Sequence, residues 1–458
     1  MFSIRDTIVL AALLVSVPIC FVRPVYGVAA WTIMAFANPQ NFGWGSVFQW
    51  QPAALIAVPT ILGCLFFARN WSGLRNREVV LLVSLWVWFT LTTLNSMDDP
   101  SFADKAATAW YHWNTVSKIL LMAAVSIAVS DNWRRLRWLV LAIAGSFGWL
   151  VLKNLPVMIL TNGASRIYGP DHSMIADNND FGLALNMTLP IFFFLAKTEP
   201  DKRMRRLMGF LFLATIPAIL FTYSRGDLVG LIAVLGSMVL LSKRKMALIP
   251  VLLVALAFGA LFTPQAWQDR MSLTESDKLL DASALSRLNA WTYAWRLACD
   301  YPILGGGFDA FTPRLFARYA PNAQDVHGPH SIYFGVMAEH GFVGLALYLM
   351  LVVSCFASLR RLAKTARAMD TPHIAGYANM LSLSLVGFLT SGTFLGRAYF
   401  DFFFTIVACV AILKHVSHAE WAQGTEESEP EPEDMEQPVI SYGGPDPSIR
   451  NLQRQPAP

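Results

Sequence analysis

Long apolar runs recur along most of the chain, and they constrain its fold more than any other feature. They lie near residues 7–22, 26–37, 52–68, 78–94, 116–130, 136–152, 181–196, 207–222, 228–242, 246–263, 331–357, 374–395 and 398–414. A helix needs about 20 mainly apolar residues to cross the hydrocarbon core of a bilayer. The composition agrees, because 55% of the residues are hydrophobic and only 14% are charged. The pattern predicts an all-α, polytopic integral membrane protein, a helical bundle of about 12–13 transmembrane helices.

Basic residues indicate how this bundle is oriented. They cluster at 69–77, 134–137, 197–206, 243–245 and 360–367. With the spans above, all five clusters fall on one side, which the positive-inside rule assigns to the cytoplasm. In a bacterium the other side is the periplasm, so the chain is expected in the inner membrane. The first two runs are short and separated by Arg23 and Pro24, so they are compatible with two short helices or with one broken helix, and this leaves the orientation of the N-terminus open.

The longest loop on the predicted periplasmic side covers residues 264–330. It contains the helix-compatible stretch 284–296, whose tryptophans and tyrosine suit helices that lie at the membrane interface. The segment 419–458 differs sharply, because it is acidic and rich in proline. Such a segment buries too little apolar surface to fold alone. We therefore expect a disordered cytoplasmic tail.

The sequence gives little sign of metal, disulfide or nucleic-acid chemistry. Four of the five cysteines fall in apolar runs, and none of the spacings is typical of metal ligands. Asp98 and Asp99 lack an evident third ligand and suit a solvated loop. The net charge of +4 is small and is spread over loops. We expect no metal, no cofactor and no nucleic-acid partner.

Histidine and arginine side chains lie at the predicted periplasmic ends of the helices. His327 and His330 precede a long apolar run, and Arg225 sits in a tight turn between two runs. Histidine can exchange a proton near neutral pH, and guanidinium binds phosphate oxygens in a bidentate manner. The alternative stays open for each residue taken alone. A histidine at a helix start can be an interfacial residue, and an interfacial arginine can extend to water or lipid phosphate.

Several motifs, in order, resemble the O-antigen ligase and polymerase superfamily. The motifs are Thr222–Asp227, Ser286–Trp291, Tyr301–Phe308, Pro329–Tyr333 and Glu339–Gly344, preceded by Arg166–Gly169, Asn178–Asn179 and Pro190. The resemblance covers roughly residues 160–415. The stretches 2–6 and 36–40 resemble a subgroup, the O-glycosylation ligases associated with the exosortase A system. This division suggests an N-terminal transmembrane region at 1–130, a catalytic transmembrane region at 131–418 and the tail at 419–458.

The resemblance implies a metal-independent, inverting membrane glycosyltransferase. Such an enzyme transfers a glycan from an undecaprenyl-diphosphate carrier to an acceptor hydroxyl of a lipid, protein or polysaccharide at the periplasmic face. Matched motif by motif, His330 corresponds to the catalytic base, and Arg225 and Arg287 to the arginines that contact the diphosphate. The further candidates for substrate binding are Arg166, Arg397, His327, Asn178 and Tyr333. Glu339 matches a motif but lies further along its helix, where a supporting role is expected.

Two other functions remain as alternatives. A polymerase would use the same chemistry but extend the glycan on a second lipid-linked chain, and the motifs do not separate it from a ligase. A transporter of lipid-linked sugars would favour paired repeats and interrupted helices near the middle of the bilayer. The sequence shows no convincing repeat, and its polar candidates gather at one face, which favours transfer over transport.

Overall fold

All regular elements among the described residues are helices, which confirms the predicted all-α fold. The computed structural model describes residues 4–39, 52–67, 71–161, 164–242, 246, 249 and 277–426. The helices of the first half are α1 (Ile4–Val22), α2 (Pro24–Phe36), α3 (Pro52–Phe67), η3 (Ser72–Arg75), α4 (Arg77–Asp98), η4 (Pro100–Lys105), α5 (Ala106–Val129), α6 (Trp133–Leu160) and α7 (Asn178–Thr198). The others are α8 (Lys202–Leu220), α9 (Arg225–Leu241), α12 (Asp277–Asp300), α13 (Pro313–Tyr319), α14 (Ile332–Ala368), α15 (Pro372–Gly392) and α16 (Asp401–Glu426).

Seven of the described helices are long and apolar enough to cross a membrane. They are α4, α5, α6, α7, α14, α15 and the first 23 residues of α16. Shorter apolar helices lie at Leu10–Val22, Pro24–Phe36 and Pro52–Phe67. The chain is therefore a multi-pass membrane protein. The expected span at 246–263 and the basic cluster at 243–245 lie largely outside the described residues, so the total of 12–13 crossings stays a prediction.

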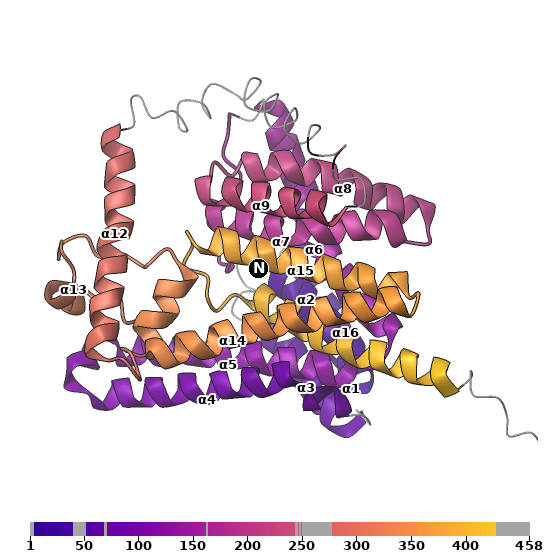
Figure 1. Ribbon diagram of the computed structural model, residues 1–458, viewed down its shortest axis with the longest axis horizontal. Helices are drawn as coiled ribbons and strands as arrows, with labels where there is room; N and C mark the ends of the chain where they lie inside the picture. Colours follow the sequence, from indigo (N-terminus) through magenta and orange to yellow (C-terminus); the bar gives the residue numbers. More distant parts are fainter. Residues whose placement is uncertain are drawn as a thin grey trace, which may run out of the picture. The chain divides into compact units, whose positions relative to one another are not determined.

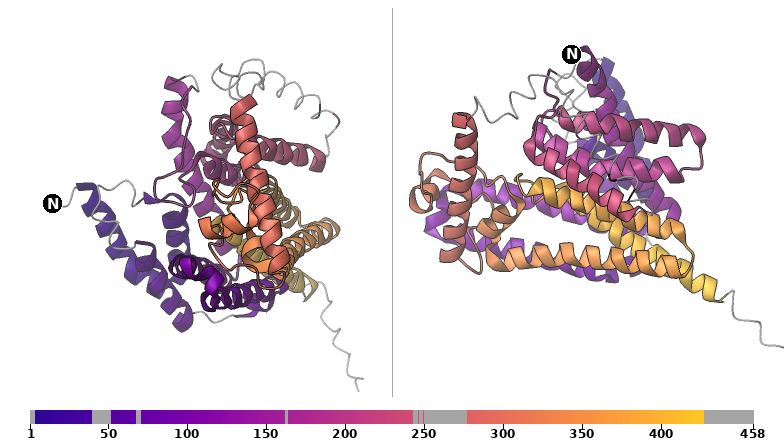
Figure 2. Two further views of the ribbon diagram at one scale, coloured as in Figure 1. Left: turned by 90° about the vertical axis from the view of Figure 1, so that its left-hand side faces the viewer. Right: turned by 45° about the horizontal axis from the view of Figure 1, so that its top comes forward.

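The long helices pack mainly through α7, α14 and α15. Helix α15 contacts α7, α9 and α14, whereas α14 also packs against α4 and α12. Helix α12 stands crosswise to α4 and α14 (Figures 1 and 2). The predicted loop at 264–330 thus contains helices, as expected, and α12 and α13 bury a cluster of apolar side chains against the first turns of α14. This packing fixes the segment that leads into α14.

Helix α14 is interrupted at Gly341, which has φ 68° and ψ −174°. The interruption leaves carbonyl groups of the preceding turn without helical partners, and the Tyr301–Phe308 turn supplies them. The backbone N–H groups of Gly306 and Gly307 donate to the carbonyls of Ala338 and Glu339 at 2.8 and 2.6 Å. In return, the N–H of Phe342 donates to the carbonyl of Pro302 at 2.9 Å. The glycines at 305–307 therefore form a tight turn, and this turn packs against the break in α14.

Replacing Gly341 with alanine should destabilise the protein markedly. The backbone region at φ 68° and ψ −174° is open essentially only to glycine, and another residue held there costs about 1–3 kcal/mol. In addition, a Cβ at Gly341 would lie 2.3 Å from the carbonyl oxygen of Ile303. Gly145, inside α6, is a matched control because a Cβ there meets nothing within 4 Å. Thermal unfolding in detergent should show a lower midpoint for Gly341→Ala and an unchanged or higher one for Gly145→Ala. Equal unfolding midpoints for Gly341→Ala and the wild type would show that the break in α14 does not require glycine.

The C-terminal helix extends beyond residue 419, where the disordered tail is predicted to begin. Helix α16 continues to Glu426, and residues 427–458 lie outside the described residues. Residues up to 417 form one compact unit, and the segment from 418 onward forms a second. The expectation of a disordered tail falls mostly on residues that the structure does not describe.

Candidate functional site

Helix α12 holds the loop that leads into α14. The amide of Asn289 donates to the carbonyls of Asn322 and Asp325 at 2.9 and 3.2 Å, and its oxygen accepts the Asn322 N–H at 2.8 Å. The hydroxyl of Ser286 donates to the carboxylate of Asp325 at 2.6 Å, and the indole of Trp291 donates to the carbonyl of Pro329 at 2.7 Å. These bonds explain why the Ser286–Trp291 and Pro329–Tyr333 motifs belong to one site.

His330 lies at the end of this loop, immediately before α14. Its backbone has φ 42°, a left-handed conformation that histidine tolerates better than most residues with a Cβ. The side chain is exposed, and its ring centroid lies 5.8 Å from that of His327. On the other side, a Cβ at Gly396 would lie 3.7 Å from the His330 backbone nitrogen. The loop thus lies between α12 and the turn that contains Arg397.

Positive charges surround His330. Although the imidazole is exposed, desolvation by the surrounding protein lowers its pKa below the ordinary value. The charges of Arg287, His327 and Arg397 lower this pKa further, and the carboxylate of Asp177 opposes them. The pKa of Arg287 is itself lowered, first by burial and then by the charge of Arg225. These couplings link His330 to Arg287, and Arg287 to Arg225. At neutral pH the imidazole is uncharged and can accept a proton.

Arg225 is the first residue of α9 and is exposed there. The side chain of Ser224 caps the helix by accepting the Asp227 N–H at 3.3 Å. The next residue, Gly226, packs against Phe394, since a Cβ at Gly226 would lie 3.1 Å from the Phe394 Cβ. The start of α9 therefore adjoins the turn that carries Arg397. The N-terminus of α9 also carries a partial positive charge, which favours the binding of an anion.

Arg397 has a protein partner that the sequence did not suggest. Its guanidinium forms a salt bridge with Asp180 in the first turn of α7, while its side chain remains 34% exposed. Asp177 and Asp180 both lie at the start of α7, where acidic residues commonly cap a helix. Asp177 does cap α7, by accepting the Asn179 N–H at 2.9 Å, whereas Asp180 orients Arg397. A carboxylate early in an otherwise apolar helix is the sequence signal that could have singled out Asp180.

Two further candidates support the turn before Arg225. The guanidinium of Arg166 lies over the ring of Tyr223, 6.0 Å from its centroid, and the Ile167 N–H donates to the carbonyl of Phe221 at 3.0 Å. The amide of Asn178 is buried and donates to the carbonyl of Thr222 at 2.7 Å. Arg166 therefore lies within the site region, and the Asn178 amide group ties α7 to the turn at 221–223.

His327 and Tyr333 flank His330 in different ways. The Nδ1 atom of His327 lies 3.2 Å from the carbonyl oxygen and 3.3 Å from the carboxylate of Asp325. Its Nε2 atom is buried and has no hydrogen-bond partner among the described residues. The hydroxyl of Tyr333 donates to the carbonyl of Leu389 in α15 at 3.3 Å. His327 is close enough to shape the charge at His330, whereas Tyr333 ties the start of α14 to α15.

The structure separates His340 and Glu339 from the exposed cluster. His340 is fully buried, and its Nδ1 atom pairs with the hydroxyl of Thr92 at 2.7 Å. Glu339 accepts hydrogen bonds from the Asp309 N–H at 2.9 Å and from the Tyr399 hydroxyl at 2.6 Å. Glu339 thus joins the broken part of α14 to the segment that follows Arg397, which agrees with its expected supporting role.

Lys105 is a supporting residue that the sequence reasoning missed. The residue is only 2% exposed, so its ammonium group lies in the protein interior. It donates to the carbonyl of Phe308 at 2.6 Å and also to that of Gly306. A buried ammonium needs such acceptors, because an unpaired one would be very costly. The N-terminal third of the chain thereby fixes the turn that caps the break in α14.

The fold and the site define a class of protein: a multi-pass helical membrane protein with an exposed histidine whose pKa is influenced by nearby arginines. Residues 210–349 match the model of the O-antigen ligase family, and residues 4–199 match a family of unknown function (DUF5935). No curated protein matches the chain. Arg225, Arg287 and His330 lie within the O-antigen ligase match, whereas Arg166 and Asn178 lie in the other match and Arg397 in neither.

Proposed function

We propose that the chain is a membrane glycosyltransferase of the ligase type, transferring a glycan from undecaprenyl diphosphate to an acceptor hydroxyl at the periplasmic face. The observation that carries the proposal is the uncharged His330 set among Arg287, Arg397 and, through Arg287, Arg225. A base beside fixed positive charge suits a reaction with a hydroxyl nucleophile and an anionic leaving group. The match to the O-antigen ligase family supports the same choice of substrates.

The proposed reaction is a single displacement. The neutral imidazole of His330 accepts the proton of the acceptor hydroxyl while its oxygen bonds to the anomeric carbon. The bond from that carbon to the diphosphate oxygen breaks at the same time, so the configuration inverts and the lipid diphosphate leaves with the electron pair. Arg287 and Arg225 stabilise the charge that develops on the diphosphate. Because this leaving group is already a stable anion, no separate general acid is needed.

Two like charges held close together make the arginine pair a binding site for an anion. Arg287 is partly buried and senses the charge of Arg225, so an anion between them relieves their mutual repulsion. The planar guanidinium fork can bind two phosphate oxygens at once. Arg397 forms a salt bridge with Asp180 in the first turn of α7, which fixes the direction of its guanidinium. We therefore assign the diphosphate to Arg225 and Arg287 and give Arg397 an orienting or acceptor-side role.

Transfer itself can be tested with purified full-length protein. It would be incubated with an undecaprenyl-diphosphate glycan and candidate acceptors, and the products identified by mass. Glycan on the acceptor, with release of undecaprenyl diphosphate, is the expected result. A ladder of longer glycans on the lipid carrier would indicate the polymerase instead. Movement of intact lipid-linked glycan without any covalent product would indicate transport and contradict the proposal.

The pH dependence of transfer should reflect the lowered pKa of His330. The base must be neutral, so the rate should fall as the pH drops through a pKa below the ordinary value of 6.5. Arg397→Gln removes one of the charges that lower this pKa. The acid limb of kcat/KM should therefore move to higher pH in that variant. An acid limb that stays fixed, or moves to lower pH, would argue against His330 as the titrating group.

A further inference from the structure

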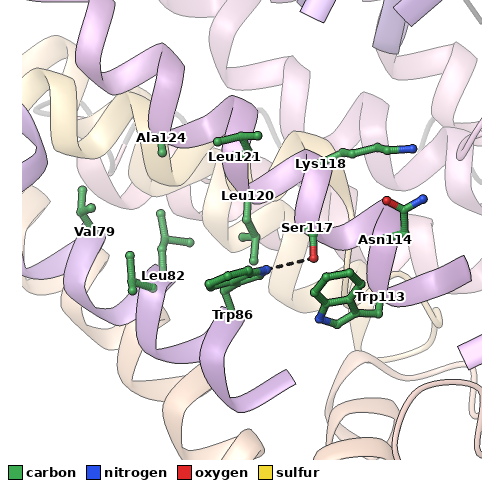
Figure 3. A pocket seen from close by; sticks show the side chains of 11 residues that line it. Val79, Leu82, Trp86, Trp113, Asn114, Ser117, Lys118, Leu120, Leu121 and Ala124 are labelled. Carbon is green, nitrogen blue, oxygen red and sulfur yellow. Dashed lines mark hydrogen bonds between the residues drawn. The ribbon is translucent and has the colours of Figure 1, made fainter. Parts of the chain in front are cut away.

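A groove between α4 and α5 has the properties of a lipid site separate from the arginine cluster. It has a volume of about 410 Å³, within the range of ligand pockets. Its apolar end is formed by Val79, Leu82, Val83, Leu120, Leu121 and Ala124. Its other end contains Asn114, Ser117 and Lys118 beside two tryptophans. Figure 3 shows these two ends, with the Lys118 side chain extending toward the end where Asn114 lies.

Lys118 is the unexpected member of this groove. It is exposed, and it lies near the middle of the 24-residue membrane-spanning helix α5. It makes no hydrogen bond or ion pair with the part of the chain that the structure describes, and neither does Asn114. An ionisable group inside a membrane span is costly unless it has a partner or reaches the interface. An anionic group near Lys118 would therefore be stabilised in this groove.

Aromatic side chains indicate how deep Lys118 lies. Trp110, Tyr111 and Trp113 occupy the first turns of α5, and tryptophan and tyrosine gather at the level of lipid headgroups. Lys118 lies five residues beyond Trp113, or about 7.5 Å along a helix. Side chains of a helix tilt toward its N-terminus, and a lysine stem can extend its ammonium group to the headgroup level. Lys118 can thus reach a lipid phosphate in the leaflet at the Ala106 end of α5.

The polar groups of the two groove tryptophans already have partners. The indole of Trp86 donates to the hydroxyl of Ser117 at 2.9 Å, and that of Trp113 donates to the hydroxyl of Thr90 at 2.9 Å. Their rings therefore act as apolar walls. What remains for a ligand is an apolar channel with one ammonium and one amide at its outer end. This arrangement complements a hydrocarbon chain that carries a single negative charge.

We propose that this groove binds one acyl chain of a monoanionic phospholipid, with Lys118 paired to its phosphate. A monoanionic phospholipid suits this groove better than a lipid diphosphate, because Lys118 is the one cationic side chain among the described residues that line it. The arginines proposed to bind a diphosphate lie at a different place, where Arg225 acts on Arg287 and Arg287 acts on His330. The site is independent of the proposed glycan transfer, since none of its residues belongs to the His330 cluster.

The test is lipid binding to the purified full-length protein, followed by native mass spectrometry with dioleoyl phosphatidylglycerol or dioleoyl phosphatidylcholine. One lysine near a phosphate contributes about 1 kcal/mol, so wild type should bind phosphatidylglycerol about fivefold more tightly. Lys118→Gln should abolish this preference and Lys118→Arg should keep it. Lys202→Gln, an exposed lysine at the start of α8, is the matched control and should behave as wild type.

A second variant tests the channel itself. Leu121→Trp fills the apolar end of the groove and should weaken the binding of both lipids, while size-exclusion chromatography and circular dichroism confirm that the variant folds. An unchanged preference for phosphatidylglycerol in Lys118→Gln would overturn the proposal. So would tighter binding of undecaprenyl diphosphate than of phosphatidylglycerol at this groove. A photo-crosslinker at position 83 that captures a protein helix instead of lipid would also overturn it.

Discussion

His330→Asn should lower the rate of glycan transfer by about 10²- to 10⁴-fold, the usual contribution of a general base. Asparagine is the informative replacement, because His330 has φ 42° and asparagine also tolerates this left-handed conformation. The variant thus removes the base while keeping the backbone that lies against Gly396. The rate of glycan transfer would be measured in vesicles that contain equal amounts of inserted protein.

The control for this variant is another histidine with a left-handed backbone. His172 has φ 55° and lies in the loop before α7. His172→Asn should retain transfer, since the charges that act on His330 do not include His172. Transfer by His330→Asn at more than about a tenth of the wild-type rate would contradict its assignment as a base. In that case the alternative of an interfacial histidine would stand.

Arg287→Lys and Arg225→Lys should each lower kcat by about 100-fold, comparable to losing one donor to a transition-state anion. Lysine keeps the charge but loses the planar fork that binds two oxygens. Both effects should appear mainly in kcat, because the diphosphate gains charge as the glycosidic bond breaks. Single-turnover measurements with saturating donor would separate this loss from weaker donor binding.

Arg318→Lys is the matched control for the arginine variants. Arg318 lies on α13 and forms an exposed ion pair with Asp300 at 3.5 Å. Exposed pairs contribute little, so this variant should transfer glycan at the wild-type rate. If Arg225→Lys and Arg287→Lys also behaved as wild type, the two arginines would be interfacial residues that extend to water or lipid phosphate. The assignment of the diphosphate would then fail.

The helical membrane class could be predicted from the sequence because it depends on local composition. A run of about 20 apolar residues must satisfy its backbone hydrogen bonds within itself, whatever the rest of the chain does. The Gly305–Gly307 turn also has a local cause, because glycine adopts positive φ without a steric penalty and two of these three glycines do so. The candidate residues His330, Arg225 and Arg287 were identified from the order of motifs. The motifs did not show which side chains meet.

The partners of the site residues could not be predicted, because they join distant parts of the chain. Arg397 pairs with Asp180 across 217 positions, and Lys105 donates to Gly306 across 201 positions. Both partners come from the segment that matches a family of unknown function. In the described structure this segment supplies supports for the site. Such contacts depend on helix packing, which composition does not encode.

The sequence alone determined that this is a multi-pass helical membrane protein with a histidine and arginines near helix ends, because apolar length and residue type are local properties. The order of motifs selected His330, but only the tertiary structure showed the physical difference between the two histidines: His330 is exposed among positive charges, whereas His340 is buried against Thr92. Both histidines belong to motifs of the same stretch, and their spacing gives no reason to separate them. The difference arises because α14 breaks at Gly341 and packs against α4, which buries one imidazole and leaves the other in the loop before the helix.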